Sequence, residues 1–174
     1  MKILIGSTVA LALLALVVVL VGSRLPERHR ARMTARIDTT PETVYALIAD
    51  VEHAPEWRKD VTSVERLPAE DGTPRFRENG KHGKITYRIE AAEAPHRFVT
   101  RIADTDLGYG GSWTWDIRPD GSGSLVTITE DGEVGSPLFR FLSRYVFGHY
   151  ASLESTLRAL GARFGGSAPR RLDD

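Results

Sequence analysis

The sequence predicts an α+β domain in which a curved antiparallel sheet of about seven strands surrounds one long C-terminal helix, preceded by one transmembrane helix. Three patterns support this prediction. An uncharged apolar run lies near the N-terminus, segments that alternate with a period of two follow one another between residues 61 and 130, and apolar residues recur every three or four positions from residue 138 to 164. The chain has 174 residues, and without its apolar N-terminal run and polar C-terminal residues it has the length of a single domain.

The apolar run extends from Ile3 to Val21 and contains 19 residues without a charge. At ~1.5 Å per helical residue it reaches ~28 Å, close to the thickness of a hydrocarbon core. We therefore expect a transmembrane helix over residues 3–22. The alternative is a cleaved secretory signal, but its apolar stretch is usually only about 7 to 15 residues long, so the length favours an anchor.

Positive charge lies mainly after this run. Only Lys2 precedes it, whereas five arginines follow it: Arg24, Arg28, Arg30, Arg32 and Arg36. Because Lys and Arg near a span end are retained on the cytoplasmic side, we expect a single-pass membrane protein with a cytoplasmic domain. Residues 23–33 are then a basic juxtamembrane linker, and the membrane is a partner through residues 3–22.

The domain itself is expected over residues 34–164. A short strand at 33–37 leads into a helix at 41–49, which begins with capping residues and a proline in its first turn. A turn around Trp57 follows this helix. The later strands are separated by short segments rich in Gly, Asp, Asn and Pro, which favour antiparallel neighbours. We expect strands at 61–67, 75–79, 84–91, 97–103, 112–117 and 125–130.

The last expected element is one long helix from Pro137 to Phe164. Its apolar residues form a single stripe, which needs a sheet to cover. Gly165 and Gly166 end the helix, and residues 165–174 are expected to form a disordered tail.

Composition excludes several kinds of chemistry. Lys plus Arg and Asp plus Glu number 23 each, so nothing in the overall charge favours nucleic acid as a partner. The absence of Cys excludes disulfides, thiolate nucleophiles and cysteine-ligated metals. The histidines lack the spacing of metal ligands, and the chain has no phosphate-binding loop or nucleophile elbow. We expect neither a metal nor a cofactor.

Four stretches carry a resemblance to a known superfamily. They are Pro41-Glu-Thr-Val-Tyr-Ala-Leu-Ile-Ala-Asp50 with Trp57, Gly111-Ser-Trp-Thr-Trp115, Gly123-Ser-Leu-Val-Thr-Ile-Thr-Glu130 and Pro137-Leu-Phe-Arg-Phe-Leu142. With them, residues 34–164 resemble the START-related polyketide cyclase/dehydrase and lipid-transport superfamily, also named Bet v 1-like or SRPBCC. The resemblance implies a helix-grip fold with an internal cavity for lipids, sterols, polyketides or other apolar molecules. It implies no particular reaction, because no catalytic pattern matches.

Candidate ligand-binding residues follow from alternation along the strands. Trp113 and Trp115 share one face of their strand, and Tyr87 is in phase with Ile85 and Ile89. Such aromatic side chains either line a cavity or simply fill the core. The residues expected to contact a ligand are Trp57, Tyr87, Trp113, Trp115, Tyr145 and His149.

Candidate catalytic residues are Glu130, Arg101 and His149. Glu130 is in register with apolar Val126 and Ile128, and a carboxylate on an inner face is desolvated or paired, as in general acids and bases. Arg101 is its expected partner, in a buried ion pair at one end of the pocket. The alternative is that Glu130, at a strand end, points to solvent, and that His149 on the helix stripe is purely structural.

We therefore expect a membrane-anchored binding module that holds a hydrophobic small molecule or lipid in an internal cavity. One alternative is an enzyme of the cyclase or dehydratase kind that acts on a polyketide-like substrate. Another is an interaction scaffold whose cavity is filled by aromatic side chains. An apolar cavity favours the first, a polar cluster inside it favours the second, and a solid core favours the third.

Overall fold

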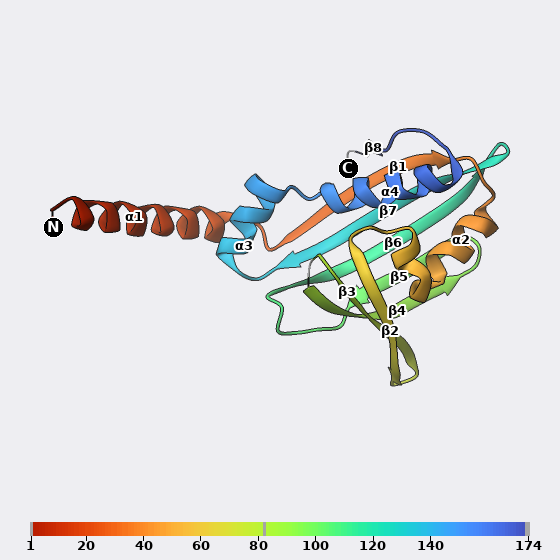
Figure 1. The fold of residues 1–174 in the computed structure, drawn as a ribbon, viewed down its shortest axis with the longest axis horizontal. Helices are drawn as coiled ribbons and strands as arrows, with labels where there is room; N and C mark the ends of the chain where they lie inside the picture. The colour runs from red at the N-terminus through yellow and green to blue at the C-terminus, as the bar shows by residue number, and fades with distance from the viewer. Residues whose placement is uncertain (1, 82, 173–174) are drawn as a thin grey trace.

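The computed structural model describes the backbone of residues 2–81 and 83–172, with side chains except those of residues 2–12 and 147. In this part of the chain, an eight-stranded sheet has the strand order β2-β3-β4-β5-β6-β7-β1-β8 (Figure 1). The elements in order are α1 (Lys2–Arg24), β1 (Arg28–Ile37), α2 (Pro41–Ala49), the 3₁₀ helix η1 (Val51–Glu56), β2 (Val61–Glu70), β3 (Thr73–Gly80), β4 (Gly83–Glu93), β5 (Arg97–Ile102), β6 (Tyr109–Asp120), β7 (Gly123–Val134), α3 (Pro137–Leu142), the π-helical turn η2 (Ser143–Phe147), α4 (Ala151–Phe164) and β8 (Arg170–Arg171).

Tight hairpins produce the meander from β2 to β7. Asp71 and Gly72 adopt positive φ values of 49° and 76° between β2 and β3, the conformation that a two-residue hairpin turn requires. Gly121, with φ of 60°, allows the equally tight turn between β6 and β7. β1 then pairs antiparallel with β7 along the full length from Arg28 to Ile37, so the N-terminal strand extends the sheet beyond the last strand of the meander.

The main core lies between the inner face of the sheet and the helices α2 and α4. Leu153, Leu157 and Leu160 of α4 are at most 1 % exposed and pack with inward-facing residues of β1, β6 and β7. Val44 and Ile48 of α2 join the same cluster. This arrangement of a curved sheet around a C-terminal helix fits the helix-grip prediction, with one strand more than expected.

The predicted C-terminal helix is broken rather than continuous. α3 and η2 end at Gly148, whose φ of 74° is left-handed and interrupts the helical path before α4. Of these C-terminal segments, α4 is the one whose residues join the core against the sheet. α3 instead lies against α1, and at Gly22 a Cβ atom would clash with the Pro137 carbonyl oxygen. The apolar residues before the break therefore contact α1, and those after it contact the sheet. Tyr145 and Val146, just before the break, are each 60 % exposed.

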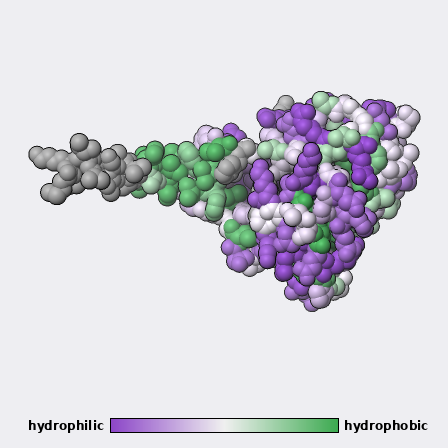
Figure 2. Space-filling model, viewed as in Figure 1, coloured by the Kyte–Doolittle hydropathy of each residue, from purple (hydrophilic) through white to green (hydrophobic). Residues whose placement is uncertain are grey.

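The predicted transmembrane helix over residues 3–22 is wrong: of the helices that the structure describes, none combines the length and the apolar character needed to cross a membrane. Among the described side chains of α1, the exposed large apolar ones are Leu13, Leu14, Leu16, Val17, Val19, Leu20 and Val21. Figure 2 shows these apolar side chains beside the largely polar surface of the domain. The predicted single-pass location with a cytoplasmic domain depended on that helix and is corrected with it.

The sheet extends beyond the limits expected for the domain. β1 begins at Arg28, and its pairing with β7 places Ala31 and Met33 of the expected linker in the core. Residues of the expected tail also pair with β1, through the bridge from Gly166 to Ile37 and through β8. Backbone groups of both segments thus find partners in the sheet. Asp173 and Asp174, also in that tail, lie outside the described residues.

Candidate functional site

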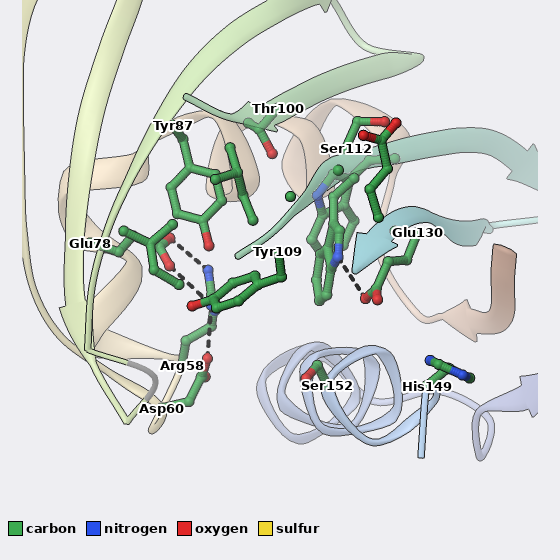
Figure 3. A pocket seen from close by; sticks show the side chains of 18 of the residues that line it. Arg58, Asp60, Glu78, Tyr87, Thr100, Tyr109, Ser112, Glu130, His149 and Ser152 are labelled. Atoms are coloured by element: carbon green, nitrogen blue, oxygen red, sulfur yellow. Dashed lines mark hydrogen bonds and ion pairs between the residues drawn. The ribbon is translucent and has the colours of Figure 1, made fainter. Parts of the chain in front are cut away.

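A cavity of about 460 Å³ lies between the inner face of the sheet and the segments η1, α3, η2 and α4. Its walls are mainly aromatic and aliphatic, and the aromatic residues among them are Trp57, Phe76, Tyr87, Phe98, Tyr109, Trp113, Trp115 and Phe139. Polar side chains gather at two separate places, one around Arg58 and the other around Glu130 (Figure 3). A pocket of this volume, with few polar groups in an apolar wall, is typical of small-molecule sites.

The two tryptophans of β6 lie in the cavity wall, as their alternation predicts. Trp113 and Trp115 point to the same side of the strand, and their rings meet edge to face with centroids 6.5 Å apart. Tyr87 of β4 also lines the cavity and stacks on Phe76 of β3 at 5.3 Å. Trp57, which follows η1, completes this set.

Glu130 lines the cavity but does not pair with Arg101. Its Oε1 lies 3.1 Å from Nε2 of His29, and Nε1 of Trp113 donates to its Oε2 at 2.8 Å. An ionised carboxylate only accepts, so the His29 ring donates from Nε2. The glycine opposite His29 makes room for this ring, because a Cβ at Gly132 would clash with the imidazole.

The predicted Glu130–Arg101 pair is wrong, because the residues of β5 that face inward are the ones on either side of Arg101 in the sequence. Phe98, Thr100 and Ile102 line the cavity, and Arg101 therefore points to the outer face. There its Nε donates to Glu90 Oε1 at 2.9 Å. This arrangement buries the aromatic side chain of Phe98 and leaves the charge of Arg101 near solvent.

His149 follows the break at Gly148 and lines the cavity beside Glu130. Its ring stacks on that of His29 with centroids 3.9 Å apart and an interplanar angle of 29°. Burial lowers the pKa of His149, and the neighbouring His29 lowers it further. Tyr145 does not join them, because it is exposed and its ring packs on Phe141 at 5.0 Å.

The Arg58 end of the cavity was not predicted from the sequence. Arg58 Nη1 donates to Glu78 Oε1, and Nη2 donates to Asp60 Oδ2, both at 2.8 Å. Burial raises the pKa of Glu78, an effect that Arg58 opposes. Burial likewise raises the pKa of Tyr87, whose hydroxyl points toward the Arg58 guanidinium in Figure 3.

Part of this cluster left a signal in the sequence. Glu78 alternates with Phe76 on β3, so a buried phenylalanine predicts an inward carboxylate two residues later. Arg58 and Asp60 lie in the irregular segment before β2, where no periodicity indicates which way a side chain points. Among the described residues, no group of three or more His, Cys, Asp or Glu could hold a metal ion.

Comparisons with known proteins agree with this architecture. The family model "Polyketide cyclase / dehydrase and lipid transport" matches residues 28–165. Similar solved structures include a START superfamily protein from Mycobacterium smegmatis, at 20% identity, with 78% of this chain and 97% of that chain covered and a TM-score of 0.63. A protein from Thermus thermophilus shows 25% identity over 78% of this chain and 96% of that chain, with a TM-score of 0.62.

The aromatase/cyclase Zhui from Streptomyces sp. R1128 has 16% identity, covers 78% of this chain and 93% of its own, and has a TM-score of 0.61. No curated protein sequence matches the chain. The family match spans most of the chain, and it confirms the START-related resemblance. On this evidence the chain belongs to the polyketide cyclase/dehydrase and lipid-transport family.

Proposed function

We propose that this domain is a binding module that holds a hydrophobic small molecule or lipid in the cavity between the sheet and the helices. The observation that supports it best is the cavity itself, about 460 Å³ in volume and walled mainly by aromatic and aliphatic side chains. Burying a ligand against Trp57, Trp113 and Trp115 removes apolar surface from water, at ~25 cal/mol per Å². The same volume argues against a scaffold whose core is filled by these side chains.

Native mass spectrometry of the full chain, purified from the producing cell, tests the proposal. We expect a co-purified hydrophobic molecule at a ratio of one per chain. Trp113→Ala should weaken binding of that molecule by at least about tenfold, or ~1.4 kcal/mol. The domain should also lose ~3–5 kcal/mol of unfolding free energy.

Leu157→Ala is the matched control for this variant. Leu157 is buried on α4 but does not line the cavity, so its truncation should cost ~2–5 kcal/mol of stability without weakening ligand binding. Equal losses of affinity in both variants would mean that Trp113 acts only through stability. A chain that copurifies empty and binds no hydrophobic molecule from a lipid extract would contradict the proposal.

A second candidate function is catalysis of the cyclase or dehydratase kind. The observation that favours it is the hydrogen bond between Glu130 and His29 inside an apolar cavity, since such a pair can exchange a proton with a bound carbonyl compound. Glu130→Gln separates the two functions. Turnover of a polyketide-like substrate with unchanged rate and pH profile in this variant would exclude Glu130 as acid or base, while hydrophobic binding would persist.

A further inference from the structure

A second pocket, of about 200 Å³, lies on the outer face of the sheet. It crosses the four adjacent strands β6, β7, β1 and β8, and its lining residues belong to these strands or directly follow β8. One row of paired positions runs across all four strands and consists of Asp116, Thr127, Thr34 and Arg170. The residues from β1, β6 and β7 point outward, because their sequence neighbours Met33, Trp115 and Val126 are buried in the core.

Three arginines border this outer pocket: Arg32 of β1, Arg118 of β6 and Arg170 of β8. The register of the strands places Arg118 on one side of the row that contains Arg170, and Arg32 on the other. The one carboxylate among the described lining residues belongs to Asp116, and its Oδ1 lies 3.5 Å from Nη1 of Arg97. The outer pocket therefore carries an excess of positive charge.

Arg118 and Arg170 differ from Arg30, which lies on the same face of the sheet. Arg30 donates to Asp131 from Nε at 2.6 Å and from Nη2 at 3.1 Å. Within residues 2–81 and 83–172, the side chains of Arg118 and Arg170 make no such hydrogen bond or ion pair. Like charges that lie close together on one face of a sheet repel one another, so these two guanidiniums indicate an anion that balances them.

From these observations we infer that the outer pocket is a binding site for a dianionic phosphate group, either free or carried by a small ester. A guanidinium presents its N–H groups in a planar fork that matches two oxygens of a phosphate. A phosphate group carries about −1.5 to −2 charges at pH 7, which balances Arg118 and Arg170 together. Leu125 and Leu172 also line the pocket and are half-buried, so they offer apolar surface to the organic part of an ester.

NMR titration of the isotope-labelled full chain tests this site, with inorganic phosphate, phenyl phosphate and acetate as probes. The ionic strength is held constant, because salt screens exposed charges. Amide shifts of Thr127 and Leu172 give the dissociation constants. We expect phosphate to bind at least about tenfold more tightly than acetate, since its second charge meets a second guanidinium. Tighter binding of phenyl phosphate supports an ester as the ligand, whereas equal or weaker binding supports free phosphate.

Three variants locate the anion. Arg118→Met and Arg170→Met should each weaken phosphate binding by at least about fivefold, because each removes one guanidinium. Asp116→Asn should strengthen binding by about threefold, because it removes a carboxylate from the pocket, and a loss of stability cannot imitate a gain in affinity. Arg66→Met is the matched control, since Arg66 is an exposed arginine of β2 that pairs with Glu52 and does not line the pocket.

The alternative counter-ion is the acidic end of the chain, since Asp173 and Asp174 follow Leu172 in the sequence. The double variant Asp173→Asn/Asp174→Asn should bind phosphate as tightly as the unaltered chain. Binding that occurs only in this double variant would overturn the phosphate site in favour of an ion pair within the chain. Phosphate shifts that do not saturate, or equal losses of affinity in Arg118→Met and Arg66→Met, would also overturn it. The outer pocket and the cavity lie on opposite faces of the sheet, so none of these results bears on the proposed hydrophobic binding.

Discussion

At one end of the cavity, Glu130 accepts hydrogen bonds from His29 and Trp113, whereas at the other end Arg58 donates to Glu78 and Asp60. The Glu130 carboxylate is built into the sheet, because its partners lie on the adjacent strands β1 and β6. Arg58 instead joins two carboxylates, Asp60 from the segment before β2 and Glu78 from β3. The comparison indicates that the Glu130 cluster is held within the sheet, whereas the Arg58 cluster joins the irregular segment before β2 to the sheet.

The largest effect is expected from breaking the Arg58 cluster. Arg58→Met leaves Glu78 and Asp60 close together without their cation, and the Glu78 side chain is only 13 % exposed. We expect a loss of ~3 kcal/mol in unfolding free energy, measured by urea denaturation. Arg101→Met removes a partner from the more exposed pair with Glu90 and should cost under ~1 kcal/mol. Equal losses would contradict the buried role of Arg58.

A smaller effect is expected at the opposite end. Glu130→Ala removes the acceptor of Trp113 Nε1 and of His29 Nε2, which should cost ~2 kcal/mol in the same measurement. Glu133→Ala, on the same strand, serves as the control because its carboxylate is half exposed and pairs with the exposed side chain of Arg28. A loss of stability no larger than that of the control would mean that Glu130 is not a structural acceptor.

Gly132→Ala tests the same end without removing a charged group. The added methyl group would occupy the space of the His29 ring, so His29 must move away from Glu130. We expect a cost of ~1–2 kcal/mol and a changed chemical shift of the His29 ring protons. Gly110→Ala is the control in a nearby strand, since nothing lies within 4 Å of a Cβ built there. Unchanged His29 resonances in Gly132→Ala would contradict the predicted displacement.

The smallest effect is a pH dependence from His149. Burial and His29 lower its pKa below the ordinary value of 6.5, with Arg144 acting in the same direction and Glu130 opposing both. Between the lowered pKa and 6.5 the unfolded chain binds more protons, so stability falls as the pH falls through this window. His149→Asn should make the stability profile flatter there, as measured by thermal unfolding from pH 5 to 8, a range of about three units around the histidine pKa.

His53 changes the pH dependence of stability in the opposite direction to His149. It is therefore replaced in both of the variants that are compared. Its hydrogen bond to Asp50 raises its pKa, so it contributes stability below 6.5 that is lost as the pH rises. The measurement therefore compares His53→Asn with the double variant His53→Asn/His149→Asn. Identical profiles would show that His149 does not couple folding to protonation.

Periodicity predicted most of the sheet correctly, and it placed Trp113 and Trp115 on the cavity side. It failed for β5, where Phe98, Val99 and Thr100 are all buried and either phase is plausible from the sequence. A shift in register between β4 and β5, at Ile89 and Ala91, adds to this ambiguity. Arg101 was therefore assigned to the wrong face. Tyr145 was misplaced because the apolar stripe continues through the break at Gly148.

The sequence by itself determined the local elements, because alternation and turn residues act over a few neighbouring positions. It also determined that Glu130 shares a face with buried residues, since Val126 and Ile128 precede it in the same strand. Only the tertiary structure decided what Glu130 contacts. His29 lies 101 residues away and reaches it through the antiparallel register of β1 and β7, in which Gly132 stands opposite His29. Likewise, Arg58 and Glu78 lie in two different segments and form a hydrogen bond. The approach of these segments depends on tertiary packing, which the local sequence pattern of neither segment predicts.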